Sequence, residues 1–394
     1  MVPNEWSVVP IKKVCESIID CVNKTAPVVE YKTPFRMIRT TNVRNGRVNT
    51  EDVRYVTEDT YHQWVRRGKP QVGDIIFTRE APVGEVGILR DADGIFLGQR
   101  TMMYRADSRY ADNYFLFYSL SSRFCQIQIE DFSNGGTVAH MRVPDCGEIL
   151  INLPPLAEQK KIAQILSAWD SAISVTEKLV TNSQQQKKAL MQQLLTGKKR
   201  LLDENGMRFS GEWVRNVSLG SVVELRKGVQ INKDTLTEYG KYPVINGGIT
   251  PSGFTSEFNT ATNTITISEG GNSCGFIAIQ KTPFWCGGHC YAVVKTELDN
   301  AFMFQLLKFN ELKIMGLRVG SGLPNIQKKS LELFTVTYPA IHAEQQKIAS
   351  ILSAADAEIS TLERKLACLK DEKKALMQQL LTGKRRVTVG ADSV

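Results

Sequence analysis

The chain has 394 residues and carries 49 Lys and Arg against 41 Asp and Glu, which gives a formal net charge of +8. Its hydrophobic content of 42% is enough to bury sizeable cores, and no stretch approaches the roughly 18 apolar residues of a membrane-spanning helix. The N-terminal residues MVPNEWSVVPIKKV lack the apolar core of a signal peptide. We therefore expect a cytoplasmic protein of two or more domains without a membrane segment, whose positive charge permits phosphate binding.

The first segment, residues 1–152, is predicted to be a globular domain of strands and helices. It opens on Trp6, which an apolar strand-like run with Ile11 and Val14 follows. The stretch GDIIFTREAPVGEVGIL from Gly73 predicts a strand, a polar loop with glycine and a second strand. A further strand carries Gly98 in IFLGQRTMMYR, and the Gly-rich loop SNGGTVAHMR precedes the next long element.

Polar side chains that suit base recognition gather in this first segment. Arginine can bind guanine with two hydrogen bonds, and Asn or Gln can bind adenine in the same way. They lie in YKTPFRMIRTTNVRNGRV and in the loops that follow predicted strands. The alternative for each is a solvated surface or a turn contact. The candidates are Lys32, Arg36, Arg39, Thr40, Thr41, Asn42, Arg44, Arg47, Thr78, Arg79, Gln99 and Arg100.

Residues 153–200 are predicted to form one helix of about 40 residues, roughly 60 Å long. Pro154 and Pro155 mark its start, and Gly197 followed by basic residues marks its end, where glycine can adopt the left-handed C-cap. Apolar residues repeat with 4,3 spacing, which is typical of a coiled-coil seam that three polar residues weaken locally. The seam comprises Ile162, Leu166, Trp169, Ile173, Thr176, Val180, Ser183, Lys187, Leu190 and Leu194.

The segment 201–337 repeats the skeleton of the first domain with different loop residues. It opens on Trp213 with Leu219 and Val222, and NTITISEGGNSCGFIAI again predicts strand, loop and strand. Thr78 and Ser268 occupy matching positions, 190 residues apart. A constant framework with divergent polar loops is what a sequence-specific DNA reader needs. The candidates here are Lys227, Asn246, Ser268, Glu269, Asn272, His289, Ser321, Asn325 and Gln327, of which Glu269 could accept from a cytosine amino group or simply form a turn.

The segment 338–394 contains a second copy of the helix. AEQKKIAQILSAWDSAIS at Ala157 returns as AEQQKIASILSAADAEIS at Ala343, and KKALMQQLLTGKKR returns as KKALMQQLLTGKRR with the same displacement of 186 residues. Two matched copies predict two similar halves related by a pseudo-two-fold axis, with the helices paired antiparallel inside one chain. A homodimeric coiled coil is the alternative. The second seam comprises Ile348, Leu352, Ala355, Ile359, Leu362, Leu366, Leu369, Lys373, Leu376 and Leu380.

Metal binding and catalysis find little support. The eight cysteines follow no disulfide framework, and the cluster of Cys274, Cys286, His289 and Cys290 lacks the paired CxxC spacing of structural zinc sites, so we expect buried thiols and no metal. Nucleotide-binding, metalloprotease and serine-hydrolase motifs are absent. Asp145 and Glu148 faintly resemble a nuclease carboxylate pair but lack its lysine. We expect no catalytic residue.

The duplicated blocks resemble the specificity subunit of a type I restriction-modification enzyme. The matching stretches are PPLAEQKKIAQILSAWDSAI at Pro154, PAIHAEQQKIASILSAADAEI at Pro339, both KALMQQLLTGK endings, TREAPVGEVGIL with LGQR, and GSGLPNIQKKSL. The similarity covers essentially the whole chain. It implies an α+β protein with two target recognition domains, residues 1–152 and 201–337, separated by two long antiparallel helices.

The resemblance also implies a non-catalytic reader of double-stranded DNA. Each domain would bind one half of a bipartite asymmetric site, and the helices would set the spacer. One copy of the chain would hold two methylation and two restriction subunits; S-adenosylmethionine, ATP and Mg would belong to those partners, and this chain would carry no cofactor. We expect docking on an exposed face of the helices, with simple solvation as the alternative: Glu158, Gln159, Lys161, Gln192, Gln193, Glu344, Gln345, Lys347, Gln378 and Gln379.

Two rival functions remain. A stand-alone nuclease or methyltransferase would need a catalytic motif and would show turnover by the purified chain. A coiled-coil scaffold would join proteins without reading DNA, and would bind DNA either not at all or with salt dependence but no sequence preference.

Overall fold

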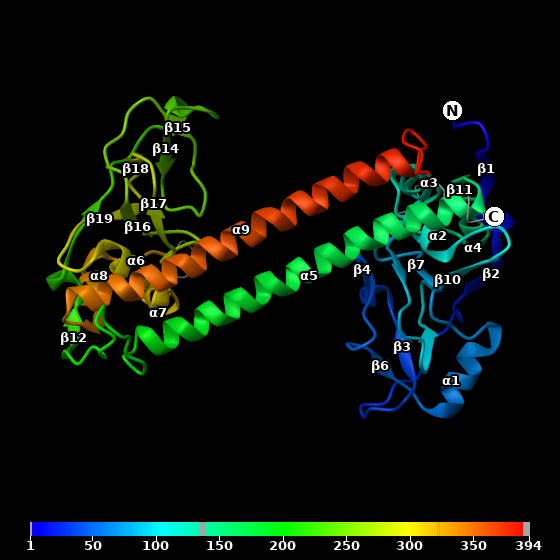
Figure 1. The fold of residues 1–394 in the computed structure, drawn as a ribbon, viewed down its shortest axis with the longest axis horizontal. Coiled ribbons are helices and arrows are strands. Elements are labelled where there is room, and N and C mark those ends of the chain that lie inside the picture. The colour runs from blue at the N-terminus through cyan, green and yellow to red at the C-terminus, as the bar shows by residue number, and fades with distance from the viewer. Residues whose placement is uncertain (1, 134–138, 321, 323, 389–394) are drawn as a thin grey trace. The chain divides into compact units, whose positions relative to one another are not determined.

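The computed structural model describes residues 2–133, 139–320, 322 and 324–388. The chain divides into two compact units, Met1–Glu177 with Lys365–Val394, and Lys178–Arg364. Each unit contains one globular α+β domain and parts of the same two long helices, α5 (Leu156–Leu194) and α9 (His342–Leu380), seen in green and orange in Figure 1. Because the boundary runs through both helices, the division into four segments stays a prediction. None of the helices in the described residues has the length and hydropathy to cross a bilayer.

The domain of the first unit is built on three sheets. Strands β1 and β11 pair antiparallel, the strand order of the largest sheet is β2-β10-β7-β8-β5-β4, and a third sheet has the order β6-β3-β9, in which β3 and β9 are parallel. The strands are β1 (Ser7–Pro10), β2 (Cys15–Asp20), β3 (Arg36–Ile38), β4 (Val43–Arg44), β5 (Gly46–Val48), β6 (Arg54–Tyr55), β7 (Ile75–Thr78), β8 (Val86–Ile88), β9 (Ile95–Leu97), β10 (Thr101–Ala106) and β11 (Leu150–Leu153). The helices are α1 (Glu58–Trp64), α2 (Asn113–Leu120), α3 (Arg123–Ser133) and α4 (Val143–Cys146), with short 3₁₀ turns at Ile11–Lys13, Thr40–Asn42 and Val65–Arg67.

The domain of the second unit repeats this topology with fewer strands. Its sheets have the orders β12-β20, β13-β19-β16-β17 and β15-β14-β18, and β14 and β18 are again parallel. The strands are β12 (Trp213–Ser218), β13 (Val223–Lys227), β14 (Tyr242–Ile245), β15 (Phe254–Thr255), β16 (Thr264–Ser268), β17 (Ile277–Gln280), β18 (Trp285–Cys286), β19 (Cys290–Thr296) and β20 (Thr335–Pro339). The helices are α6 (Asn300–Phe309), α7 (Glu311–Met315) and α8 (Lys328–Leu333), with 3₁₀ turns at Leu219–Ser221 and Lys233–Thr235.

The core of each domain includes the ends of both long helices. In the first unit, Ile162 and Leu166 near the start of α5 and Leu380 at the end of α9 pack with buried sheet residues such as Phe77 and Tyr104. In the second unit, Leu194 at the end of α5 and Leu352 near the start of α9 do the same. Burial of this apolar surface fixes each domain to the helix pair rather than leaving it on a linker.

The two helices pair antiparallel within each unit, and the predicted seams are confirmed. Each helix has 39 residues, and every seam position is buried or half-buried. The two lysines of the seams form ion pairs. Lys187 Nζ lies 2.5 Å from Asp356 Oδ1 in the second unit, and Lys373 Nζ lies 2.6 Å from Asp170 Oδ1 in the first. These lysines therefore mark the register of the antiparallel pair. The predicted α+β class, with a fold that occurs twice, is confirmed as well.

Both aspartates also bind their own domain. Asp170 accepts a hydrogen bond from the Tyr118 hydroxyl at 2.6 Å, and Asp356 accepts one from Gln305 Nε2 at 2.8 Å. Tyr118 lies on α2 and Gln305 on α6. The same charged residue thus joins the helix seam to the globular domain in each unit.

Each helix ends on a left-handed glycine, as predicted, with φ of +72° at Gly197 and +71° at Gly383. Beyond the first glycine, Arg200 forms two hydrogen bonds of 2.6 Å with Glu344, in the first turn of α9. Its guanidinium also lies 5.9 Å from the centre of the Trp213 ring. We call Arg200, Glu344 and Trp213 the second clasp.

The first unit contains the equivalent first clasp, formed by Arg386, Glu158 and Trp6. Arg386 Nε and Nη2 bind Glu158 at 2.8 and 3.0 Å, and the guanidinium lies 5.9 Å from the centre of the Trp6 ring. The end of one helix is therefore tied to the beginning of the other in both units.

Four expected docking residues are buried in these connections, so the expectation that they are exposed is wrong. Glu158 and Glu344 lie inside the clasps. Gln159 accepts from the backbone N–H of Asp112 and donates to Pro154, and Gln345 makes the same bonds with Asp299 and Pro339. The physical reason is that both Gln side chains satisfy the backbone where α2 and α6 begin.

The clasps should differ in strength. Substituting Arg200 by Ala leaves the fully buried Glu344 carboxylate unpaired, and we expect it to lower the free energy of unfolding by about 2 to 4 kcal/mol. Arg386→Ala should cost less, because Arg386 is more exposed and Glu158 keeps a hydrogen bond from Trp6 Nε1.

Urea unfolding followed by circular dichroism measures both losses. Lys198→Ala removes an exposed cation from the same turn and is the matched control. An Arg200→Ala loss no larger than that of Lys198→Ala would contradict the role of the clasp.

Candidate nucleic-acid interface

Three segments that are distant in sequence meet at the end of one sheet strand in each domain. In the first domain, Arg79 follows β7, its N–H donates to the carbonyl of Arg100 at 2.8 Å, and its carbonyl accepts from Met141 at 3.0 Å. In the second domain, Glu269 follows β16 and makes the corresponding bonds with His289 and Ile326, at 2.9 and 2.8 Å. We call each meeting point the loop junction of its domain.

A fourth segment joins each junction through the parallel strand pair. Gly98 donates to Ile38 at 2.7 Å, and Gly287 donates to Ile245 at 2.8 Å. A Cβ atom at Gly98 would lie 2.7 Å from the Ile38 oxygen, so only glycine allows this approach. The residues after β3 and β14, Arg39 and Asn246, are thereby brought to the junctions. Each loop junction therefore brings together candidate base-reading residues that were predicted from separate stretches of the sequence.

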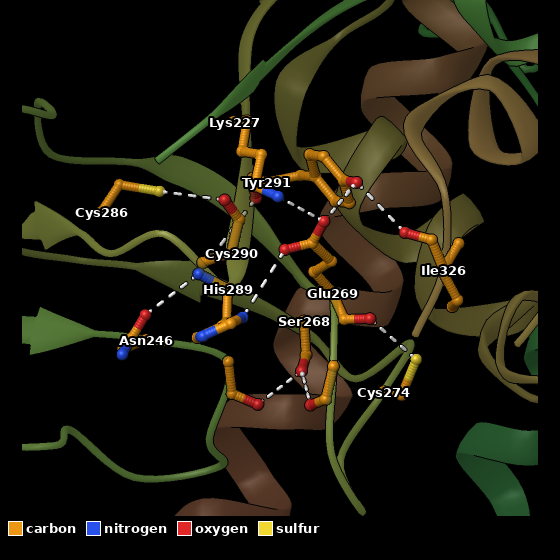
Figure 2. A network of polar contacts seen from close by, with 12 residues as sticks. Lys227, Asn246, Ser268, Glu269, Cys274, Cys286, His289, Cys290, Tyr291 and Ile326 are labelled. Carbon is orange, nitrogen blue, oxygen red and sulfur yellow. Dashed lines mark hydrogen bonds and ion pairs between the residues drawn. The ribbon is translucent and has the colours of Figure 1, made fainter. Parts of the chain in front are cut away.

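Glu269 is the centre of a polar network in the second junction, which Figure 2 shows. Its Oε1 atom accepts from Lys227 Nζ at 2.6 Å and lies 2.9 Å from the Tyr291 hydroxyl. Its Oε2 atom lies 3.8 Å from His289 Nδ1. The Tyr291 hydroxyl is also 3.1 Å from the carbonyl oxygen of Ile326. Burial and the Glu269 carboxylate raise the pKa of Tyr291, which keeps its hydroxyl a proton donor.

Some candidates of the second domain hold the junction together, while others face solvent. Ser268 is buried, and its hydroxyl donates to the carbonyl of Gly247. Asn246 is half-buried and accepts from the backbone of His289 at 3.0 Å. The exposed candidates are Lys227, Asn272, His289, Asn325 and Gln327. Ser321 lies outside the residues that the structure describes.

Thr78 and Arg79 of the first domain belong to its framework. The Thr78 hydroxyl is buried, donates to Pro82 at 2.7 Å and accepts from the backbone of Glu85. Arg79 exposes 8% of its side chain, pairs with Asp20 at 3.1 Å and donates to the carbonyl of Met141. These side chains were predicted to contact bases, but the structure buries them because they stabilise the end of β7.

The exposed side chains of the first junction surround Glu80. Arg100 Nε lies 2.8 Å from Glu80 Oε2, and His140 Nδ1 lies 2.6 Å from Glu80 Oε1. Gln99 is exposed and accepts a hydrogen bond from Thr25 at 3.2 Å. Sequence reasoning missed Glu80 and His140, although Glu80 adjoins Arg79 in TREAP and His140 lies in the polar loop before α4.

The candidate residues between 31 and 48 differ in how far they are exposed to solvent. Asn42 is buried, and its amide accepts from the backbone of Arg39 and donates to Asn49 and Asp52, so its two N–H donors are used inside the loop. Lys32 and Thr41 are exposed, and Thr40 is half-buried.

Three arginines of this stretch have partners within the first unit. Arg36 Nη2 lies 2.8 Å from Asp91 Oδ2. Arg44 donates to the backbone carbonyls of Thr40 and Val43. Arg47 Nη2 lies 3.0 Å from Glu177 Oε2 on α5. Arg39, the residue directly after β3, is the arginine of this stretch that lies at the loop junction. The stretch is therefore not one continuous recognition surface.

The remaining docking candidates lie on the two helices. Lys161, Gln192, Gln193, Gln378 and Gln379 are exposed, and Lys347 is half-buried. Their role in docking stays a prediction.

The cysteine cluster is buried and its thiols donate hydrogen bonds. Cys274 Sγ lies 3.0 Å from the Glu269 carbonyl oxygen, and Cys286 Sγ lies 3.6 Å from the carbonyl of Cys290. Burial raises the pKa of the Cys274 thiol. Across the residues that the structure describes, no group of three or more His, Cys, Asp or Glu side chains is arranged to hold a metal ion.

The two carboxylates considered as a nuclease pair bind separate cations. Asp145 lies 2.7 Å from Arg142, and Glu148 pairs with Lys12. Their arrangement is that of surface ion pairs.

Comparison with known proteins identifies the family. The model described as "Type I restriction modification DNA specificity domain" matches residues 3–182 and 211–370, so each match covers one globular domain and part of a helix. The chain belongs to this family. The resemblance seen in the duplicated blocks is thereby confirmed.

Relatives of this specificity family match the chain to different extents. A type I specificity subunit of Mycoplasma pneumoniae is 37% identical over 156 residues, which cover 39% of this chain and 41% of that protein. The MjaX specificity subunit of Methanocaldococcus jannaschii is 25% identical over 433 aligned residues, 98% of this chain and 95% of the relative. The crystal structure of a type I S subunit from M. genitalium shares the fold, with a TM-score of 0.67, 19% identity and 98% and 99% coverage.

The structure separates two arginines that the sequence treats alike. Arg79→Ala removes the nearer of the two cations that pair with Asp20, leaves Arg67 at 3.7 Å, and should cost about 3 kcal/mol of folding free energy. Arg100→Ala should change stability by less than about 1 kcal/mol, because its ion pair with Glu80 is half-exposed, and should weaken DNA binding instead. Urea unfolding and DNA binding measure the two effects, and a reversed order would contradict the assignment.

Proposed function

We propose that this chain is the DNA-recognition subunit of a type I restriction-modification complex, and that each globular domain reads one half of a bipartite asymmetric site. One observation carries the proposal. The same framework occurs twice, with the same backbone bonds at both loop junctions, while the exposed side chains differ. Two copies of one scaffold with different reading residues suit two different half-sites.

The chemistry of the exposed residues supports base reading. Arg100 and Gln99 in the first junction, and Asn325 and Gln327 in the second, are donors and acceptors of the kind that distinguish base pairs in the major groove. Other cations of the chain would contact phosphates and give affinity without sequence preference. The proposal requires both contributions.

The paired helices would set the spacer between the half-sites. A helix of 39 residues is about 58 Å long at the usual rise of 1.5 Å per residue. That length exceeds one turn of DNA, about 34 Å. The paired seams and clasps would hold both domains against one duplex, with unread base pairs between them.

The repeated helical ends would dock the partners. Gln192 and Gln193 on α5 recur as Gln378 and Gln379 on α9, and all four are exposed. Two equal surfaces suit two copies of a methylation subunit, and two restriction subunits would join them. The partners would supply S-adenosylmethionine, ATP and Mg, and one copy of this chain, itself non-catalytic, would act in the cytoplasm.

The methylation pattern of genomic DNA tests the function. The chain would be expressed with its cognate methylation subunit, and modified bases would be mapped by single-molecule sequencing. We expect one bipartite asymmetric motif with one modified adenine on each strand. Assembly of the complex without any motif would instead favour the scaffold, and turnover by the purified chain alone would favour an enzyme.

Substitutions in one domain should affect one half-site. Asn325→Ala or Gln327→Ala should cost about 1 to 3 kcal/mol on duplexes with an intact second half-site and leave recognition of the first unchanged. Thr282→Ala, which removes an exposed hydroxyl outside the junction, is the control. Equal losses on all sequences would mark a phosphate contact and refute base reading by these residues.

A further inference from the structure

A carboxylate in the first loop junction holds a histidine and a cation at the surface. The Glu80 Oε1 atom lies 2.6 Å from His140 Nδ1, and its Oε2 atom lies 2.8 Å from Arg100 Nε. The two oxygens of one side chain thus fix two neighbours at once.

A second such trio occurs in the other domain (Figure 2). Glu269 binds Lys227 Nζ at 2.6 Å through Oε1 and faces His289 Nδ1 at 3.8 Å through Oε2. The Tyr291 hydroxyl, 2.9 Å from Oε1, holds the carboxylate from the protein side. The chemistry of carboxylate, histidine and cation is the same as in the first domain.

The two trios are built from positions that do not correspond. By its backbone bonds, Glu269 corresponds to Arg79, so Glu80 lies one residue further along the chain. His140 precedes α4, whereas His289 precedes β19. The shared framework therefore does not dictate these trios. Their independent occurrence at both junctions points to a common task at the surface.

Within each trio the carboxylate is mostly buried, whereas the histidine and the cation are exposed to solvent. The carboxylate side chains of Glu80 and Glu269 are only 20% and 13% exposed. The histidines and the cations are 41% to 63% exposed. A carboxylate aimed at DNA would repel phosphates, whereas one that faces its own cation and histidine orients them without adding exposed negative charge.

The orientation of the rings determines what they can bind. Because Nδ1 of His140 lies 2.6 Å from a carboxylate oxygen, that nitrogen carries the hydrogen in the neutral ring, and Nε2 is left as an acceptor. Nδ1 of His289 faces Glu269 Oε2 at the longer distance of 3.8 Å, which turns Nε2 of this ring away from the carboxylate as well. An acceptor suits the exocyclic amino group of adenine or cytosine in the major groove. The adjacent Arg100 or Lys227 supplies donors for guanine or for phosphate.

We propose that His140 and His289 are specificity-determining residues of the first and second half-sites, each accepting a base amino group through Nε2, and that Glu80 and Glu269 are positioning residues that orient them with Arg100 and Lys227. The inference rests on the proposed function of the chain as a DNA reader. It assigns to Glu269 a supporting task, in place of the direct contact with cytosine that the sequence suggests.

The test uses the complex of the full chain with its methylation subunit and three duplexes. One carries both half-sites, and each of the others has one half-site scrambled. The quantity measured is the ratio of the affinities for the intact and the scrambled duplex, for each half-site. The variants are His140→Ala, His289→Ala, Glu80→Gln and Glu269→Gln, with Glu51→Gln and Glu224→Gln as controls that remove one exposed charge from each domain.

Each variant should reduce the ratio for its own half-site alone. We expect His289→Ala to lower the second ratio at least tenfold and Glu269→Gln at least fivefold, while affinity for the scrambled duplex is unchanged or higher. His140→Ala and Glu80→Gln should act in the same way on the first ratio. A merely structural role for either glutamate would weaken binding to intact and scrambled duplexes equally and would lower thermal stability.

Three results would overturn the proposal. The first is an unchanged second ratio in His289→Ala, whose exposed side chain can be removed without unfolding the domain. The second is a Glu→Gln effect no larger than that of the control in the same domain. The third is equal binding of all three duplexes by the unsubstituted complex, which would refute the proposed function together with this inference, whereas the first two refute the inference alone.

Discussion

The arrangement of each unit depends on the ion pair that ties the end of one long helix to the beginning of the other. In both pairs, Arg200 with Glu344 and Arg386 with Glu158, the glutamate is buried and the guanidinium lies near an indole ring, although Arg386 itself is exposed. Because the helix ends also form part of each domain core, the same contacts set the register of the helices and the attachment of the domain. Aspartates that bind both a seam lysine and a domain helix add a second connection in each unit. A domain held at several points on its helices can present loops in a defined orientation, which the proposed recognition of a bipartite site would require.

The two domains keep the framework constant and vary the chemistry at the loop junction. Gly98 allows close approach to the carbonyl of Ile38, Gly287 leaves room for the Asn246 side chain, and the backbone bonds around Arg79 and Glu269 close the junction in the same way. The side chains at that place do not correspond. One domain has a buried arginine there and the other a half-buried glutamate, and the exposed groups come from different segments. Specificity can therefore diverge without a change in the fold, since the loops contribute contacts and the sheets contribute position.

The sequence predicted what depends on local period and missed what depends on contacts between distant segments. The seam of both helices and the glycines at their ends were correct, because heptads and C-caps are visible within one helix. The burial of Glu158 and Gln345 was missed, because polar residues beside a seam usually face solvent and only the fold reveals Arg386 or the N–H of Asp299 as partners. The joint role of Glu80 and His140 was missed for a similar reason, since 60 residues separate them along the chain. Arg79 follows a strand like any surface arginine, and its pairing with Asp20 is a tertiary contact.

The proposed function requires that the two domains read one duplex together. The most direct measurement is the affinity of the assembled complex for duplexes that carry both half-sites, with the spacer varied one base pair at a time over half a helical turn. We expect a sharp optimum, with affinity at other spacers falling to that of a duplex with a single half-site, because the proposed helical ruler would not follow the rotation of the second half-site. Affinity that does not depend on the spacer would contradict it, since the domains would then bind independently.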